Sequence, residues 1–326
     1  TCPTTSEYCI AENTDCNFEI ITNVSVSNLN KCTGCDAPYD DFTTDTVYMV
    51  PGQTYNGTAT KSDILTNYVM KIFIDWNDDK TFDPTEEIVC NLQGTSTYTY
   101  TIIPPLTAAN GPKRMRVRMV QNGNPSACGI AGRGDVEDYT ILLDPAGPPA
   151  PANDECATPF TLIATPSCAE DCGSTVGATE SNPAGTNCAA GTANDVWYSF
   201  DANGVDPYEI QVTGQGTFDP VLELFSDCGV TSIDCNDTSA VGQTELISAG
   251  VLAAGTYYIR IYGADGDGNF KTCVRSLVDA PGTDCDNALL LTDVNAYCSD
   301  DAQYNNIGAG SSGEFISCNW NGGGND

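Results

Sequence analysis

The sequence predicts an all-β fold of tandem β-sandwich modules of the jelly-roll or immunoglobulin-like type. Runs such as residues 97–103, 115–120 and 255–262 are short and rich in β-branched and aromatic side chains, as strands are. Glycine, asparagine, aspartate and proline bound these runs, which is typical of turns. Because no long segment has the period of an amphipathic helix, short strands separated by turns indicate sandwiches.

The cysteine content indicates an exported, extracellular protein. Seventeen cysteines in 326 residues point to an oxidising compartment, because the cytosol keeps such thiols reduced. We expect disulfides to staple the modules, although seven cysteines per complete module leave the pairing open. No stretch approaches the roughly 20 apolar residues that cross a bilayer, so no direct membrane insertion is expected.

The charge and the absence of histidine exclude several function classes. A formal charge of −32 repels phosphate backbones and anionic lipids, so nucleic acid is not an expected partner. The same charge suits cation binding, and equally suits a solvated acidic surface. Without histidine there is no Ser/His/Asp or Cys/His nucleophile and no histidine-ligated zinc. No carboxylate pair suggests a glycosidase, so we expect no enzyme.

Two linkers divide the chain. Residues 144–152 are rich in proline and alanine, and residues 278–283 form a shorter break. The sequence therefore predicts a first module over residues 1–143, a second over residues 153–277 and the start of a third over residues 284–326.

The second and third modules are predicted to be repeats. Cys156 and Cys168 are 12 positions apart and Cys285 and Cys298 are 13, and the next cysteine follows after 20 in both cases. The chain ends before the strand equivalent to residues 196–200, so we expect it to be a piece of a longer protein with further repeats.

Five motifs lie in the first module: Tyr8-Cys9, VPGQTY at 50–55, IDWNDD at 74–79, RMRVR at 114–118 and GDVEDY at 134–139. Together they resemble the GEVED domain of bacterial secreted proteins over about residues 7–143, departing at Asp135, where the family motif has glutamate. In the second module, DVWYSF at 195–200, FDPVLEL at 218–224 and AGTYYIRI at 254–261 resemble the bacterial pre-peptidase C-terminal β-sandwich.

The resemblance implies a cell-surface protein. Such modules occur in large adhesins of Bacteroidota, including gliding adhesins, that are exported by the type IX secretion system. The implied partners are a surface polysaccharide or protein ligand and the secretion and surface-anchoring machinery, with the protein held at the outer membrane. The alternatives are a structural subunit that self-associates into an extracellular fibre or sheath through strand edges, or an accessory region of a secreted hydrolase.

One loop predicts a calcium site. Calcium takes six to eight oxygen ligands, and oxygen-bearing side chains occupy positions 1, 3, 5, 7, 9 and 12 of an EF-hand-like loop. These residues are Asp75, Asn77, Asp79, Thr81, Asp83 and Glu86, with Glu87 able to replace Glu86. Position 6 holds Lys80 where the turn prefers glycine, at a cost of about 1 kcal/mol. The alternative is a solvated acidic turn.

Two weaker acidic groups lie in the second module. Asp265, Asp267 and Asn269 occupy positions 1, 3 and 5 of a turn that lacks a terminal glutamate, so a plain hairpin turn is the preferred interpretation. Asp219, Asn236 and Asp237 form another candidate only if their loops meet.

A basic stretch shares one face of a predicted strand. Lys113, Arg114, Arg116 and Arg118 alternate with apolar residues. Binding of an acidic glycan is one interpretation. The preferred one is that these side chains form ion pairs within the module with Asp135, Glu137 and Asp138.

Cys32 and Cys35 have the spacing of redox and zinc motifs, but no histidine or second matching pair accompanies them, so we expect a structural disulfide. Trp76, Trp197 and Trp320 are candidates for stacking on sugars, and the apolar strand around Trp197 indicates a core position instead.

Overall fold

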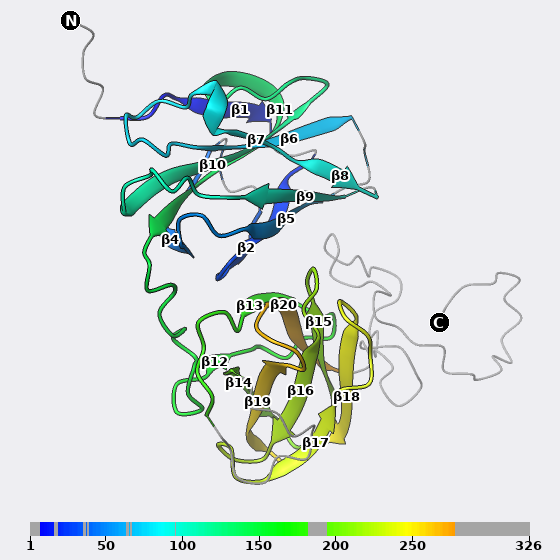
Figure 1. Ribbon diagram of the computed structural model, residues 1–326. Helices are drawn as coiled ribbons and strands as arrows, with labels where there is room; N and C mark the ends of the chain where they lie inside the picture. The colour runs from blue at the N-terminus through cyan, green and yellow to red at the C-terminus, as the bar shows by residue number, and fades with distance from the viewer. Residues whose placement is uncertain are drawn as a thin grey trace, which may run out of the picture.

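The computed structural model describes residues 7–15, 19–34, 37, 39–62, 65, 67–94, 96–181 and 194–277. In this part of the chain the regular structure is β, apart from one 3-10 turn, η1 (Pro84–Glu86). Figure 1 shows two bodies of strands joined by a linker. The all-β sandwich prediction is confirmed. The predicted third module, Cys35 and Trp320 lie outside the described residues.

The first sandwich consists of two sheets. One has the order β1-β11-β10-β6-β7, with β4 also pairing with β11, and the other has the order β3-β2-β5-β9-β8. The strands are β1 (Ala11–Asp15), β2 (Ile21–Val26), β3 (Leu29–Cys32), β4 (Asp40–Met49), β5 (Tyr55–Lys61), β6 (Tyr68–Ile74), β7 (Glu87–Val89), β8 (Asn91–Gln93), β9 (Thr97–Ile102), β10 (Gly111–Gln121) and β11 (Gly129–Leu143).

Strand β9 shows why these sheets stack. Its sequence TYTYTI alternates small polar threonines with large tyrosine and isoleucine side chains, and every second residue, a large one, faces the other sheet. Tyr98, Tyr100 and Ile102 are buried in the core. The Tyr98 hydroxyl donates a hydrogen bond to the carbonyl of Tyr68 at 2.7 Å, so the phenol satisfies its polar end inside the core.

The second sandwich has a five-stranded sheet, β12-β14-β19-β16-β17, and a four-stranded sheet, β13-β20-β15-β18. The strands are β12 (Phe160–Thr161), β13 (Asp171–Ser174), β14 (Asp195–Ala202), β15 (Pro207–Gly214), β16 (Pro220–Phe225), β17 (Ser232–Asn236), β18 (Thr244–Val251), β19 (Gly255–Gly263) and β20 (Asn269–Ser276).

Both faces of β14 are covered. Tyr198 and Phe200 point into the main core between the sheets. On the other face Trp197 is buried against Phe225 and Cys156. The expectation that Trp197 is a core residue is confirmed, which removes it as a sugar-stacking platform.

Four disulfides join described residues: Cys9–Cys128, Cys32–Cys172, Cys156–Cys228 and Cys168–Cys273. The prediction of disulfide-stapled modules is confirmed. Cys32 forms a structural disulfide as expected, but its partner is Cys172 of the second sandwich and not its sequence neighbour Cys35. The spacing of two cysteines in the sequence carries no information on a partner 140 residues away.

The Cys32–Cys172 bond is the centre of a joint between the two sandwiches. The side-chain amide of Asn30 donates to the carbonyls of Gly173 and Phe270 at 2.8 and 2.6 Å. In the reverse direction, the Asn269 amide donates to the Ser25 hydroxyl at 2.8 Å. A covalent bond surrounded by hydrogen bonds in both directions fixes β3 of the first sandwich against β13 and β20 of the second.

No helix in the described part of the chain has the length and apolar character that crossing a membrane requires.

Candidate functional site

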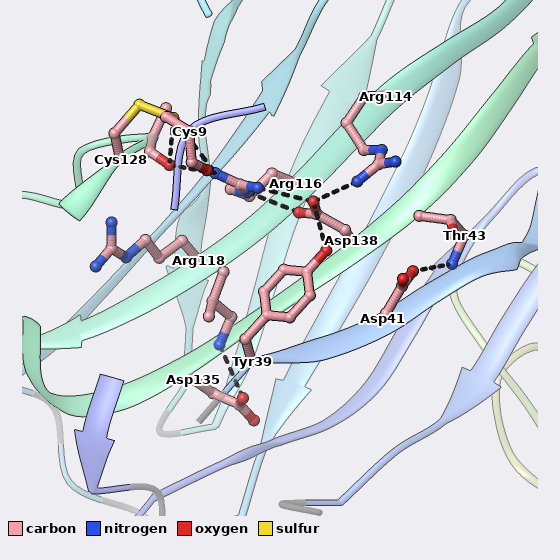
Figure 2. Close-up of polar contacts among 12 residues, drawn as sticks. Cys9, Tyr39, Asp41, Thr43, Arg114, Arg116, Arg118, Cys128, Asp135 and Asp138 are labelled. Carbon is pink, nitrogen blue, oxygen red and sulfur yellow. Dashed lines mark hydrogen bonds and ion pairs between the residues drawn. A yellow bond between two sulfur atoms is a disulfide. The ribbon is translucent and has the colours of Figure 1, made fainter. Parts of the chain in front are cut away.

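The paired strands β10 and β11 hold a group of charged side chains that contact one another (Figure 2). Arg116 lies opposite Asp138 in the register. Its Nε and Nη2 donate to the two carboxylate oxygens of Asp138 at 2.7 and 2.8 Å, which makes the pair bidentate. Arg114 Nη1 and the Tyr39 hydroxyl also donate to Asp138, at 2.8 and 2.9 Å. Asp138 is fully buried, so these four donors replace its water shell.

The arginines also hold the loop before β11. Arg116 Nη1 donates to the carbonyl of Ala127 at 2.7 Å. Arg118 donates to the carbonyls of Ser126 and Gly129, both at 2.6 Å. The disulfide from Cys9 to Cys128 closes the same region, as Figure 2 shows. These arginines therefore have a structural role between the sheet, the N-terminal segment and this loop.

The predicted ion pairs are right for Asp138 and wrong for Asp135 and Glu137. Successive side chains of a strand point to opposite faces, so residues 135 and 137 lie on the face opposite to residue 138. Asp135 accepts hydrogen bonds from the backbone N–H of Ile21 and of Val136, at 2.9 and 2.8 Å. Glu137 accepts one from the Tyr139 hydroxyl at 2.8 Å.

The inward carboxylates are a feature that the sequence analysis missed. Burial, with the nearby charge of Asp40, raises the pKa of Asp135 from 3.8 to about 7. Burial and the charges of Asp135 and Asp40 raise the pKa of Glu137 from 4.5 to about 8. The alternation with Tyr139 and Ile141 in the same strand is the signal that could have placed both carboxylates in the core.

The glycine that precedes these carboxylates is required by the close approach of β10. Gly134 has a φ of +141°, and a Cβ there would lie 2.0 Å from the carbonyl oxygen of Met119. Any other residue at position 134 would push β10 and β11 apart at the end of their pairing, next to Asp135.

A pocket of about 570 Å³ lies over the outward face of β10 and includes Tyr8, Tyr39, Arg114 and Lys80 in its lining. The Tyr8 hydroxyl donates to Asp75 at 2.8 Å, and the Arg114 guanidinium lies 4.8 Å from the centre of the Tyr8 ring. Burial and Asp138 raise the pKa of Tyr39 to about 12, so its hydroxyl stays a donor.

The predicted calcium loop begins at the end of β6. Asp75 is fully buried, and its carboxylate accepts the backbone N–H of Asp79 and of Lys80 at 3.3 and 3.0 Å. Lys80, at position 6, has a φ of +69°, the left-handed conformation for which EF-hand loops use glycine. Asn77 accepts the N–H of Asp79 at 3.0 Å, so the first three predicted ligands lie around one turn.

The end of the loop is arranged differently. Glu86 is buried, and its carboxylate accepts the backbone N–H of Trp76 at 2.8 Å and of Asp83 at 2.9 Å. Thr81 donates from its backbone and its hydroxyl to Asp79, which lowers the pKa of that carboxyl. Among the described residues, no three His, Cys, Asp or Glu side chains form a group that could hold a metal ion.

The weaker predicted groups in the second module are dispersed. Both carboxylate oxygens of Asp267 accept hydrogen bonds from the Asn194 side-chain amide at 3.0 Å. The Asn269 side-chain amide donates instead to Ser25 of the first module. Burial and the charges of Asp219 and Glu245 raise the pKa of Asp237, so Asp219 and Asp237 are close enough to interact electrostatically.

Asn236, which was predicted to lie with these two aspartates, uses its side-chain amide to donate to the carbonyl of Leu246 at 2.8 Å.

Trp76, a predicted candidate for stacking on sugars, is partly buried against the core of the first module.

Two family models match the chain. Residues 69–142 match the GEVED domain. Residues 152–273 match a galactose binding domain-like family associated with type IX secretion. The second module thus matches a galactose binding domain-like model over the residues for which the sequence predicted a resemblance to the pre-peptidase C-terminal β-sandwich.

Several solved structures align with parts of this chain. A pre-peptidase C-terminal domain of collagenase from Bacillus anthracis is 15% identical, with a TM-score of 0.25, covering 35% of this chain and 92% of that one. A two-domain protein of unknown function from Bacteroides fragilis is 8% identical, with a TM-score of 0.20, covering 77% and 95%. A putative membrane-anchored protein from Corynebacterium diphtheriae is 11% identical, with a TM-score of 0.20, covering 78% and 51%. No curated protein matches the chain.

The matched families set the broad class of this protein. Both are binding or accessory-type domains and not catalytic ones. The association of the second with type IX secretion implies a secreted or cell-surface location.

Replacing Asp138 with asparagine should destabilise the first module by about 3–5 kcal/mol, because Arg116 would remain buried without its carboxylate. Urea unfolding of the full chain measures this. The control is Glu170→Gln, which removes a surface partner of Lys271 and should cost at most about 1 kcal/mol. Equal effects of the two substitutions would contradict the role given to Asp138.

The raised pKa values of Asp135 and Glu137 predict that the stability of the folded chain decreases as the pH rises. Between about pH 4 and about pH 8 the folded chain holds protons on these groups that the unfolded chain has released, so the free energy of unfolding decreases as pH rises. Melting temperatures measured from pH 5 to pH 8 should show a smaller decrease for Glu137→Gln. Glu12→Gln, at an exposed position in β1, should keep the full decrease. An equal decrease of the melting temperature with rising pH in both variants would refute the raised pKa assigned to Glu137.

Proposed function

We propose that the chain is a non-catalytic segment of an outer-membrane-associated surface adhesin, exported by the type IX system, that holds a surface polysaccharide or protein ligand. The observation that carries the proposal is the joint at Cys32–Cys172, which links a GEVED domain and a galactose-binding-like domain covalently. A rigid pair of small sandwiches suits the task of presenting a binding surface away from the cell.

The chemistry of the charged residues supports a non-catalytic role. The carboxylates with raised pKa values, Asp135 and Glu137, lie inside the first sandwich and not in the pocket over β10. The outward carboxylate, Asp138, is held by four donors and has a structural task. A general acid or base needs a carboxyl group that a substrate can reach.

Adhesion is tested with beads coated with the full chain. Their retention under flow is measured on surfaces of a neutral polysaccharide, an acidic polysaccharide and a matrix protein, against beads coated with albumin. We expect retention on at least one surface, and no release of sugar or peptide products during long incubation. Beads that are retained on none of the three surfaces would overturn the adhesin proposal, and product release would overturn its non-catalytic part.

We also propose that calcium stabilises the first module through the loop from Asp75 to Glu86. The turn at Asp75, Asn77 and Asp79 and the positive φ of Lys80 support this proposal. Full coordination would require Glu86 to exchange its contacts with the N–H groups of Trp76 and Asp83 for the metal ion.

Calcium titrated against a chelator during thermal unfolding tests this site. At a hundred times the dissociation constant, the ion should stabilise the folded chain by about 2.7 kcal/mol. Asp79→Asn should abolish most of this gain. Asp78→Asn changes the same loop at a position that is not a predicted ligand, and it should leave the gain intact. A melting temperature that calcium does not change would refute the site.

A further inference from the structure

A groove of about 870 Å³ lies beside the joint and is lined by both modules. The first module contributes the outward side chains of β5 and β9, including Asn56, Thr58, Thr99 and Thr101. The second contributes loop residues that include Gln215, Thr217 and Asn269. Sites between domains are common places for ligands, because two surfaces can contact one molecule there.

The lining differs in charge from the rest of the molecule. The whole chain carries a formal charge of −32, yet Asp267 is the one charged side chain among the described residues that line the groove. The Asp267 carboxylate already accepts the Asn194 amide at 3.0 Å. The polar lining therefore consists chiefly of hydroxyl and amide groups, which recognise uncharged hydroxyl-bearing ligands.

Two buried acceptors in the lining are unused. The amide N–H groups of Gln215 and Asn269 are engaged across the joint, Gln215 with Asn23 at 3.2 Å and Asn269 with Ser25 at 2.8 Å. The amide oxygens of Gln215 and Asn269 have no hydrogen-bond partner among the described residues, although both atoms are buried. A buried acceptor without a donor is costly, and because both side chains line the groove, a small movement of either would let a ligand hydroxyl group supply the donor.

The same strands argue against a peptide as the occupant. β5 and β9 are both internal strands of their sheet, so each has a neighbour on either side and offers no free edge for strand addition. Of the aromatic residues in the lining, Tyr100 and Phe218 are buried, and Tyr55 is partly buried with its hydroxyl accepting the N–H of Val50 at 2.8 Å, so none is a fully exposed anchor of the kind that protein interfaces use.

We infer that this groove binds a neutral polysaccharide chain through hydroxyl and amide contacts from both modules. The inference rests on the proposed adhesin function and specifies its ligand class and its site. The Cys32–Cys172 bond and the contacts around it keep the two walls at a fixed separation, so binding does not have to order them. Acidic chains are disfavoured by Asp267 and by the negative charge of the whole molecule.

Calorimetry with the full chain tests the ligand class. The probes are neutral hexasaccharides of galactose, of glucose and of mannose, and the hexamer of galacturonate, which differs from galactose by its carboxylates. At least one neutral hexamer should bind, and the galacturonate hexamer should bind at least tenfold more weakly than it does. Stronger binding of galacturonate than of every neutral hexamer would overturn the inference.

Variants locate the site. Asn56→Ala with Thr101→Ala removes a hydrogen-bonded pair from the groove wall, with a Thr101 to Asn56 distance of 2.9 Å, and should weaken binding at least tenfold. Thr213→Ala breaks a comparable hydrogen-bonded pair with Thr244 outside the groove, and it should leave binding of the hexasaccharide unchanged. Cys32→Ser with Cys172→Ser should weaken binding several-fold by loosening the walls. Melting temperatures check that each variant is folded.

The outcomes separate the two proposals. Unchanged binding in Asn56→Ala with Thr101→Ala would overturn the groove but not the adhesin. Adhesion of coated beads without binding of any neutral hexamer would overturn the ligand class alone. Beads that adhere to nothing would overturn the adhesin proposal, whereas binding of a neutral hexamer in calorimetry would leave the groove proposal in place.

Discussion

The first module depends on the bidentate contact between Arg116 and Asp138. It joins the two longest strands of the sheet at their centre, and four donors compensate the carboxylate for the loss of water. The second module has a related solution, because Arg260 is buried between the carboxylates of Asp195 and Glu223. In both sandwiches, a buried arginine on one strand can thus pair with its carboxylate only when the strands are paired in one register. Apolar side chains alone would specify that register less strictly.

Much of the fold was predictable from local patterns. The alternation of tyrosine and threonine in β9 identified a half-buried strand, and the apolar run around Trp197 identified a core strand. The pairing of Cys32 with Cys172 and the inward position of Asp135 and Glu137 were not predicted. The first depends on how two modules meet, and the second on the register of one strand, and neither property is contained in a short stretch of sequence.

The candidate sites divide in the same way. The turn around Asp75 follows from local spacing, and its backbone conformation agrees with that spacing at Lys80. The groove at the joint has no sequence motif, because its walls come from positions near 56 and 101 and from positions near 215 and 269. Such a site becomes visible only when the arrangement of the two modules is known, and its uncharged lining has meaning only against the charge of the whole chain.

The disulfide between the modules also orders the events of biogenesis. A bond from Cys32 to Cys172 joins residues 140 positions apart, so the Cys32 thiol has no correct partner until the beginning of the second module has been synthesised and has reached the oxidising compartment. Until then, Cys32 must remain reduced or take a wrong partner among the other cysteines. Correct maturation of the first module is therefore tied to the presence of the module that follows it.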